Sequence, residues 1–466
     1  MKRSLRNISP VITSHAVGQK KVLLSRSEAG CNLTQIAVTD LKAGEVALAH
    51  IHPDMQEGFY VLEGDLDVTL NDETLHCHKD DFVYVESGTA HELLAITNVR
   101  VMTIGCEIEA KRNRLYPFVF KPNLHSVIWG GSRLKPWKKH PQEDETPIGE
   151  SWEVSAVPSS PSIIDNGCWT GQSLIDVISQ MPTEILGRSV AQKYGNRLPL
   201  LVKFIDAEKD LSIQVHPDDR MAKREHNKFG KTEMWYVIDA KPGSYLYAGF
   251  KEELTPDEYR RKVEDGTITE SLARHEVRPG DVFYIPAGRV HAICGGILLA
   301  EVQQSSDVTY RIYDYNRPGM DGRPRELHTA LAAQALDYKV YDEYRTDYVV
   351  KESASSKVID SDFFNVRVVD IDQRFHRNLV KFDSFVITMC LKGSCHIKIR
   401  STQDEVVLHE GNSCLIPAAI ADYDIEPTTG HSLLLDAFID NRKANGKEQT
   451  EGLLKRLSRF LHITDR

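Results

Sequence analysis

Short segments in which apolar and polar residues alternate dominate three stretches of this chain, residues 20–110, 200–310 and 363–440. Alternation with a period of two predicts strands with one buried face, and Gly, Asn and Asp separate these segments as turn residues do. Many short strands at regular spacing are typical of an antiparallel sandwich or barrel. The pattern therefore predicts a mainly β protein that contains the same kind of β domain three times.

The repeat is clearest in one phrase, a turn residue followed at fixed spacing by Pro or Glu, a small residue and then His or Asp. The phrase runs from Gly280 to His291 in the second stretch and from Gly411 to Asp422 in the third. In the first stretch it runs from Asp80 to His91, with Asp in place of the leading Gly and Glu in place of Pro. These changes are expected to weaken the turn geometry there.

Helical periodicity appears between the β-rich stretches. We predict helices over 173–187, 189–196, 254–275 and 329–338, and an amphipathic helix over 443–466. A charged segment with a proline, 109–123, marks a domain boundary. The predicted domains are an N-terminal barrel (1–112), a central barrel with helical segments (113–345), a third barrel (346–440) and a helical tail (441–466).

Composition narrows the class of protein. The 466 residues carry a net charge of −10, which disfavours a nucleic-acid binder because phosphate neutralisation needs a basic face. The eight cysteines form no C-x-x-C pair, a usage typical of reduced thiols in a cytoplasmic protein. No secretory signal and no apolar run long enough to span a membrane is found, so we expect no membrane partner.

The segments LSIQVHP, KTEMWYV and PAGRVHA in the second stretch carry four candidate metal ligands, Gln214, His216, Glu233 and His291. Gln214 and His216 are two residues apart, so on a strand they project to the same side. Two imidazoles, a carboxylate and a carboxamide oxygen form a mixed N/O set that suits zinc or another divalent first-row metal. Arg311 follows in the same stretch. The set predicts metal-assisted chemistry on a small polar substrate.

Residues 117 to about 340 resemble type I mannose-6-phosphate isomerase, a zinc enzyme of the cupin (jelly-roll β-barrel) superfamily. The resemblance implies zinc bound by the four residues above, Arg311 as the catalytic arginine and interconversion of mannose 6-phosphate with fructose 6-phosphate. The third stretch would be the second cupin of that family, and Asp422 in place of His indicates that it binds no metal. The matching phrases are WGG (129–131), GESWEVS (149–155), LPLLVKFIDA (198–207), LSIQVHPDD (211–219), KTEMWYV (231–237), PAGRVHAI (286–293) and DVTYRIYDYNR (307–317).

Aldose–ketose isomerisation moves a proton between C1 and C2 through an enediol, so negative charge builds on two substrate oxygens. A divalent metal and a guanidinium both stabilise such charge. Arginine keeps its proton, so Arg311 is an electrostatic partner rather than a base. The sequence leaves the proton shuttle open among Glu301, Asp307, His125 and a metal-bound water. Trp152 and Trp235 are expected to pack in the core. Candidate donors to the substrate phosphate are Ser212, Lys203 and Lys231.

A second candidate metal site lies in the first stretch. His50 and His52 share a strand face, Glu57 opens the next strand and His91 takes the place of the fourth ligand. Three imidazoles and one carboxylate suit a second divalent metal, Mn, Fe, Ni or Zn. The role of this N-terminal cupin stays open between a regulatory or dimerising module and a second enzyme, because the fold alone does not choose.

Three functions compete at this point. The first is a zinc-dependent mannose-6-phosphate isomerase with an added cupin. The second is a non-catalytic sugar-phosphate-binding regulator, and the third is a cupin oxidoreductase that acts at the N-terminal site. In each case the partner is a small molecule, and the chain is expected to be a monomer or a homodimer.

Overall fold

The computed structural model describes residues 2–13, 17–29, 33–52, 55–107, 115–141, 145–400 and 404–441. It divides into two compact units, Met1–Arg114 and Leu115–Arg466. The predicted amphipathic helix over 443–466 lies outside the described residues. Among the residues that are described, no helix combines the length and the apolar run that a membrane span requires.

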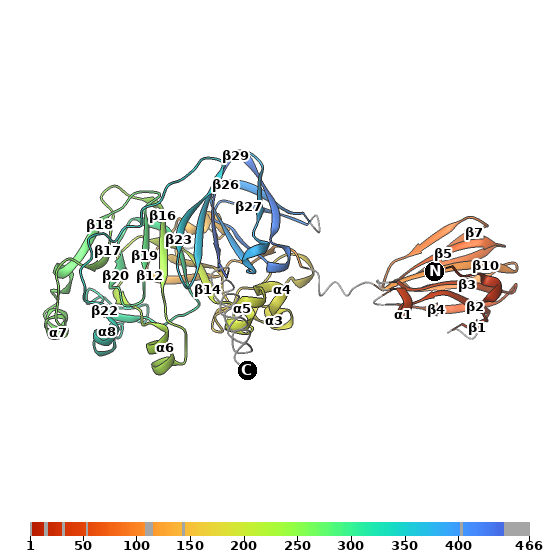
Figure 1. Ribbon diagram of the computed structural model, residues 1–466, viewed down its shortest axis with the longest axis horizontal. Helices are drawn as coiled ribbons and strands as arrows, with labels where there is room; N and C mark the ends of the chain where they lie inside the picture. Colours follow the sequence, from red (N-terminus) through yellow and green to blue (C-terminus); the bar gives the residue numbers. More distant parts are fainter. Residues whose placement is uncertain are drawn as a thin grey trace, which may run out of the picture. The chain divides into compact units, whose positions relative to one another are not determined.

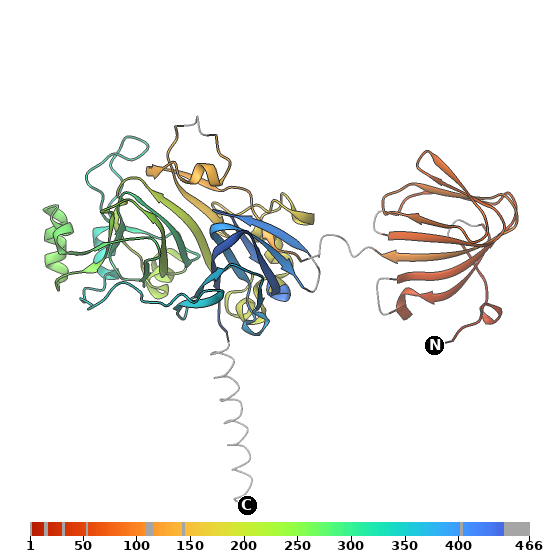
Figure 2. The ribbon, with the colours of Figure 1, turned by 90° about the horizontal axis from the view of Figure 1, so that it is seen from above.

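The smaller unit consists of two antiparallel sheets packed face to face (Figure 2). One sheet has the order β1-β2-β3-β10-β5-β8 and the other the order β4-β9-β6-β7. Alternate residues of the strands point inward, where Phe59, Val61, Leu66 and Val68 are buried. The elements are η1 (Leu5–Asn7), β1 (Val11–Ile12), β2 (Gln19–Ser25), α1 (Arg26–Ala29), β3 (Leu33–Leu41), β4 (Val46–His50), β5 (Met55–Glu63), β6 (Leu66–Leu70), β7 (Glu73–Cys77), β8 (Phe82–Val85), β9 (His91–Ala95) and β10 (Val99–Glu107).

The first part of the larger unit is a second pair of sheets, with the orders β12-β13-β14-β21-β16-β19 and β18-β17-β20-β15-β22. Strands β14 and β21 are buried along their whole length, so their polar residues Lys203 and Glu301 are buried together with the apolar ones. The strands are β12 (Leu124–Gly131), β13 (Ile148–Val154), β14 (Leu200–Ala207), β15 (Ile213–Val215), β16 (Glu233–Ala240), β17 (Tyr245–Phe250), β18 (Leu272–Glu276), β19 (Val282–Ile285), β20 (His291–Ile293), β21 (Ile297–Gln304) and β22 (Tyr310–Tyr313). The short strand β11 (Phe118–Val119) precedes them and pairs with β28 of the last part.

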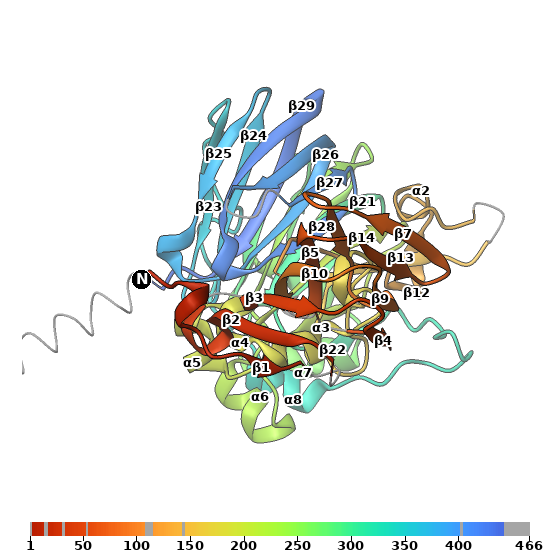
Figure 3. The ribbon, with the colours of Figure 1, turned by 90° about the vertical axis from the view of Figure 1, so that its right-hand side faces the viewer.

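The last part of the larger unit is built on β23 (Ala354–Asp360), β24 (Asn365–Ile371), β25 (Phe375–Asn378), β26 (Val386–Ile399), β27 (Glu405–His409), β28 (Ser413–Ile416) and β29 (Asp422–Phe438). These strands stand together in Figure 3, where β26 pairs with both β28 and β29. One apolar core joins this part to the preceding sheets, because Phe204 and Val302 belong to the same buried cluster as Phe364 and Ile387. The two parts therefore share a hydrophobic interior.

Helices accompany the strands of the larger unit along one side in Figure 1. The predicted helices over 173–187, 189–196 and 329–338 are confirmed as α3 and α4, α5, and α8. The helical elements are α2 (Leu134–Trp137), η3 (Gly167–Trp169), α3 (Leu174–Gln180), α4 (Pro182–Leu186), α5 (Arg188–Tyr194), α6 (Asp219–His226), α7 (Pro256–Glu264), η4 (Ile268–Ser271), α8 (Thr329–Ala335), η5 (Val380–Phe382) and η6 (Ala418–Ile420).

The prediction of one helix over 254–275 is wrong in its second half. The helix α7 begins with a capping box at Thr255 and ends at Glu264, and Gly266 follows with a φ of +70°. The chain then forms β18, which pairs with β17. Helix α6, whose cap is the Asp218 carboxylate, was not predicted.

The mainly β class is confirmed, and so is the repeated turn. Asp80, Gly280 and Gly411 adopt φ angles of 75°, 92° and 77°. The expected weakening of the first turn is not seen in its backbone, because Asp occupies the left-handed region more readily than most residues. The repeated turn also holds the strand end that carries a candidate ligand. The Gly288 amide donates to the His216 carbonyl, and the Gly88 amide donates to the His52 carbonyl.

Candidate active site and metal centres

The structure brings three of the four predicted ligands of the larger unit into one buried cluster, and the fourth adjoins it. His216 follows β15, while Glu233 and His291 are the first residues of β16 and β20. The Glu233 carboxylate lies 3.4 Å from the Nε2 atoms of His216 and His291. Gln214 lies opposite His291 on the neighbouring strand, and its amide nitrogen is 3.3 Å from His291 Nε2.

Both histidines present Nε2 to the cluster because the other ring nitrogen is occupied. His216 Nδ1 donates to the Val308 carbonyl at 3.0 Å, and His291 Nδ1 donates to the Arg289 carbonyl at 2.9 Å. A backbone carbonyl on Nδ1 fixes the tautomer in which Nε2 carries a lone pair. Burial lowers the pKa of His291, and burial with the Lys231 charge lowers the pKa of His216 to about 3. Both rings are therefore neutral at pH 7, as metal ligands must be.

The Glu233 carboxylate is the clearest sign of a metal site. Its side chain is fully buried, and among the described residues neither oxygen accepts a hydrogen bond of regular geometry. The Lys231 ammonium, 2.8 Å from Glu233 and 3.0 Å from His216 Nε2, is the nearby charge. Burial alone would raise the pKa of Glu233, but Lys231 and the two imidazoles hold it well below its ordinary value. A buried anion with two neutral imidazoles and an adjoining carboxamide group fits a divalent cation.

A cavity of about 360 Å³ opens beside this cluster. Gln214, Lys231, Glu301, Asp307 and Arg311 all line it. Arg311 lies on β22 directly opposite Gln214 on β15, and this strand pairing brings Arg311 to the site. The structure thus gathers around one cavity the residues that the sequence proposed for catalysis.

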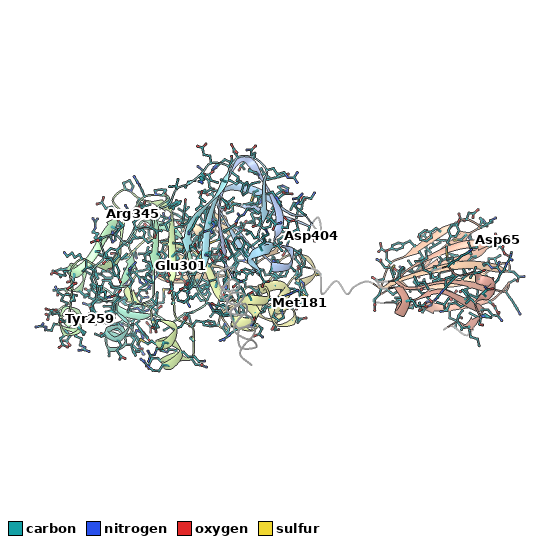
Figure 4. All side chains as sticks on the ribbon, viewed as in Figure 1. Asp65, Met181, Tyr259, Glu301, Arg345 and Asp404 are labelled. Carbon is teal, nitrogen blue, oxygen red and sulfur yellow. The ribbon has the colours of Figure 1, made fainter. Side chains whose placement is uncertain are left out.

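The proton-shuttle candidates differ sharply in their surroundings. Glu301, labelled among the central strands in Figure 4, is buried and accepts a hydrogen bond of 3.0 Å from Trp235 Nε1. Burial and the Glu233 charge raise the pKa of Glu301. Asp307 is exposed and pairs with Lys228 at 2.5 Å. His125 stacks on Trp152, and burial lowers its pKa.

The three predicted phosphate donors line the same cavity but are not equivalent. Lys203 lies between two carboxylates, 3.6 Å from Glu150 and 3.4 Å from Glu301. Lys231 contacts the metal-ligand set, as described above. Ser212 is buried immediately before β15. The assignment of these residues to the phosphate stays a prediction.

The lining also includes residues that were not predicted as site residues, among them Glu150, Trp152, Arg325 and His328. The alternating segment GESWEVS carried a signal for the first two, because Glu150 and Trp152 share one face of β13. Trp235 is fully buried as expected, whereas the prediction for Trp152 was wrong: it is half-buried and borders the cavity. Arg325 and His328 lie in a segment without regular periodicity, which the sequence pattern did not mark.

The smaller unit also assembles its predicted ligands. Glu57 lies 3.2 Å from His91 Nε2 and 3.4 Å from His52 Nε2. The ring centroids of His50 and His91 are 4.2 Å apart. Nδ1 of His50 and of His91 faces a backbone carbonyl, from Leu48 and Thr89, so both rings direct Nε2 into the group. Three imidazoles converging on one buried carboxylate fit a divalent metal here as well.

Burial disfavours the charged form of His91, but the Glu57 carboxylate and the Thr89 carbonyl outweigh it and raise the pKa of His91. A metal bound at this group would therefore displace a proton more readily as pH rises.

Comparison with known proteins identifies the family. The sequence family described as "Phosphomannose isomerase type I, catalytic domain" matches residues 118–253, and the family "Mannose-6-phosphate isomerase, cupin domain" matches residues 354–431. Mannose-6-phosphate isomerase ManA of Bacillus subtilis is 32% identical over 313 residues, which span 66% of this chain and 96% of ManA. The chain belongs to the type I mannose-6-phosphate isomerase family. The resemblance seen in the sequence is thereby confirmed.

Other relatives agree with this assignment. The mannose-6-phosphate isomerase of Streptococcus mutans is 32% identical and covers 68% of this chain and 98% of its own length. The crystal structure of the mannose 6-phosphate isomerase from Bacillus subtilis superposes with a TM-score of 0.62 at 32% identity, over 69% of this isomerase-family chain and 99% of its own. A phosphomannose isomerase mutant from Salmonella typhimurium, at 19% identity and a TM-score of 0.56, shows the shared fold alone.

The smaller unit of this mannose-6-phosphate isomerase family member has its own match. The general family "Cupin domain" covers residues 37–105, which include all four candidate ligands of that unit. The N-terminal cupin is therefore an addition to the isomerase domains, as the sequence indicated.

Proposed function

We propose that the larger unit interconverts mannose 6-phosphate and fructose 6-phosphate. The observation that carries the proposal is the single cavity lined by Arg311, by the raised-pKa carboxyl of Glu301, and by Gln214 and Lys231, which contact the buried His216–Glu233–His291 cluster beside it. An aldose–ketose isomerase needs charge stabilisation and a proton carrier at adjacent positions, and this cavity offers both. The names of the curated relatives support the same substrate.

We propose that Gln214, His216, Glu233 and His291 hold one zinc ion. When bound, a divalent metal stabilises negative charge on substrate oxygens. The chain's own residues keep the site ready for it, because two carbonyl-anchored imidazoles stay neutral and Glu233 stays ionised. Lys231 balances part of the carboxylate charge from within the cluster.

We assign to Arg311 the stabilisation of negative charge on the enediolate. Its backbone is held on both sides by His328, whose ring Nδ1 accepts from the Arg311 amide at 3.2 Å and whose amide donates to the Arg311 carbonyl at 2.7 Å. One guanidinium nitrogen donates to the Glu326 carbonyl, while the buried Nε has no acceptor among the described residues. Burial and the nearby Arg325 lower the pKa of Arg311, yet a guanidinium stays charged at working pH.

Glu301 is our candidate for moving the proton between C1 and C2. A useful base has a pKa near the operating pH, and burial with the Glu233 charge shifts Glu301 in that direction. Trp235 orients one carboxylate oxygen, and Lys203 lies 3.4 Å from the other, which has no hydrogen bond among the described groups. Exposed Asp307 is the weaker candidate because Lys228 already pairs with it.

The test is an isomerase assay on the purified full chain with mannose 6-phosphate. We expect Arg311→Ala to lower kcat by about a hundredfold or more, as loss of an electrostatic donor does, and Arg311→Lys to recover part of it. Arg260→Ala, which removes an exposed arginine of α7 paired with Asp257, is the matched control and should leave kcat unchanged. Absence of turnover by the metal-loaded protein would exclude this substrate and leave the sugar-phosphate-binding regulator.

We also propose that His50, His52, Glu57 and His91 bind a second divalent metal. Metal analysis after mild chelation should give one equivalent for each unit. Iron in the N-terminal cupin together with oxygen uptake would support the oxidoreductase alternative. A cytoplasmic location and a monomer or homodimer remain parts of the proposal, and the described cysteines, all free thiols, agree with a reducing compartment.

A further inference from the structure

The smaller unit contains a cavity of its own beside its metal-ligand group. Its volume is about 190 Å³, roughly half that of the catalytic cavity at about 360 Å³. Ligand cavities for drug-sized molecules usually exceed about 300 Å³. A hexose phosphate is therefore a poor match, and the occupant must be smaller than the substrate of the larger unit. The lining is Thr13, Val17, Lys20, Gln35, Thr39, Leu41, Ala47, His50, His52, Met55, Glu57, Phe59, Leu93, Val101 and Thr103.

Among the described residues that line this cavity, Lys20 is the one lysine or arginine. Lys20 on β2 lies opposite Thr39 on β3, and both line the interior. Its ammonium donates to Gln35 Oε1 at 3.1 Å, and within the described chain no carboxylate approaches it within ion-pair distance. Because Gln35 accepts from Lys20 through its oxygen, its amide NH2 is left to donate. Lys20 and Gln35 thus form a pair of neighbouring donors inside the barrel.

Gln35 of the donor pair and Glu57 of the metal-ligand group lie on the same sheet, with one strand between them. Gln35 on β3 and Glu57 on β5 both pair with Gly105 of the intervening β10. Two strand spacings separate them, about 10 Å between backbones. A molecule only a few bonds long can therefore reach from one to the other.

The charge of the cavity favours an anion. Glu57 is the one acidic side chain among the described residues that line it. With a divalent ion bound by neutral imidazoles and Glu57, one positive charge is left, and Lys20 adds another. Leu41, Phe59 and Val101 give the walls between the two ends an apolar surface, beside the hydroxyls of Thr39 and Thr103. A short hydrocarbon body packs against this apolar surface without leaving polar groups unpaired.

We propose that the N-terminal cupin binds a small organic carboxylate with an apolar body, whose carboxylate group is held by Lys20 and Gln35 and whose other end faces the His50–His52–Glu57–His91 group. This site is separate from the isomerase cavity, and the inference does not rest on the proposed isomerase activity.

The test is calorimetric titration of the full-length, metal-loaded chain with isovalerate, a branched carboxylate, and with isovaleramide, its uncharged analogue of the same shape. We expect saturable binding of isovalerate and at least about tenfold weaker binding of isovaleramide, as the loss of a charged hydrogen-bonded partner predicts. Lys20→Met should weaken isovalerate binding by at least about tenfold, and Lys20→Arg should restore most of it.

The neighbouring Lys21 provides the matched control. It lies on the same strand but donates to the Leu5 carbonyl rather than lining the cavity, so Lys21→Met should leave isovalerate binding unchanged. Arg311→Ala separates the two units, since binding that survives it does not occur at the catalytic arginine. Thermal unfolding of each variant verifies that the N-terminal cupin is folded.

The proposal is overturned if isovalerate does not bind, if isovaleramide binds equally well, or if Lys20→Met binds isovalerate as the natural chain does. Loss of binding in Arg311→Ala alone would place the carboxylate in the isomerase cavity and would equally exclude the proposal. Inactivity toward mannose 6-phosphate with intact isovalerate binding would contradict the isomerase and leave this site standing.

Discussion

Replacement of Glu301 by Gln tests the proton-transfer assignment most directly. The change removes the ionisable group but keeps the shape of the side chain and an oxygen for the Trp235 hydrogen bond. Lys203 loses one carboxylate at 3.4 Å and keeps Glu150 at 3.6 Å, so the site should stay folded. Loss of a positioned general base lowers kcat by about a hundred- to ten-thousandfold. That range corresponds to about 2.7 to 5.4 kcal/mol in the activation barrier.

The pH dependence supplies a second readout. A base is active when deprotonated, so kcat of the natural chain should rise with pH through the pKa of Glu301, which lies above the ordinary value of 4.5, and then level off. The variant should lose this limb of the profile. Its exchange of the substrate C2 hydrogen with deuterated solvent should slow in the same proportion as kcat.

Glu150→Gln is the matched control because Glu150 also lines the cavity and also neighbours Lys203. Although burial opposes ionisation, Lys203 lowers the pKa of Glu150, so this carboxylate is ionised throughout the measured range. Its replacement should leave the acidic limb in place. Retention of kcat within a few-fold in Glu301→Gln, or an equal loss in both variants, would refute proton transfer by Glu301 and point to the charge of Lys203 instead.

Three further outcomes are expected. The metal-loaded chain should hold two divalent ions by elemental analysis, and His52→Ala should remove one of them without lowering isomerase kcat; a single ion in the natural chain would contradict this. Asp436→Asn should reduce the free energy of unfolding in urea by about 3 to 5 kcal/mol, since it leaves buried Arg377 without its partner at 2.7 Å, whereas Glu208→Gln at an exposed pair should cost less than about 1 kcal/mol. The free energy of unfolding of the metal-free larger unit should fall as pH decreases below 6.5, and His216 alone contributes about 1.4 kcal/mol per pH unit. The unfolded His216 ring takes up a proton that the folded ring, with a pKa of about 3, does not, and buried His291 acts in the same direction. Calorimetric scans at several pH values measure this slope, and a flat profile would refute it.

Local sequence patterns determined the strands and the ligand sets of both units. Gln214 and His216, like His50 and His52, are two residues apart, so a strand directs them to one side whatever surrounds it. The turn that ends at His291 is encoded by a residue with positive φ, and that requirement is local too. These features could be predicted because only neighbouring residues enter them.

The tertiary structure decided what depends on pairing between distant segments. After Gly266 the chain forms only the short η4, and the residues from Leu272 onward become β18, because the edge of β17 offers them a partner. Glu301 acquires a raised pKa only because folding buries it near Glu233. Lys20 reaches Gln35 only because β2 pairs with β3, and both side chains then line the cavity. A one-dimensional pattern records which face a side chain takes within its own strand. Strand register decides which charged groups and aromatic rings lie next to that face, and register is fixed only when the whole sheet forms.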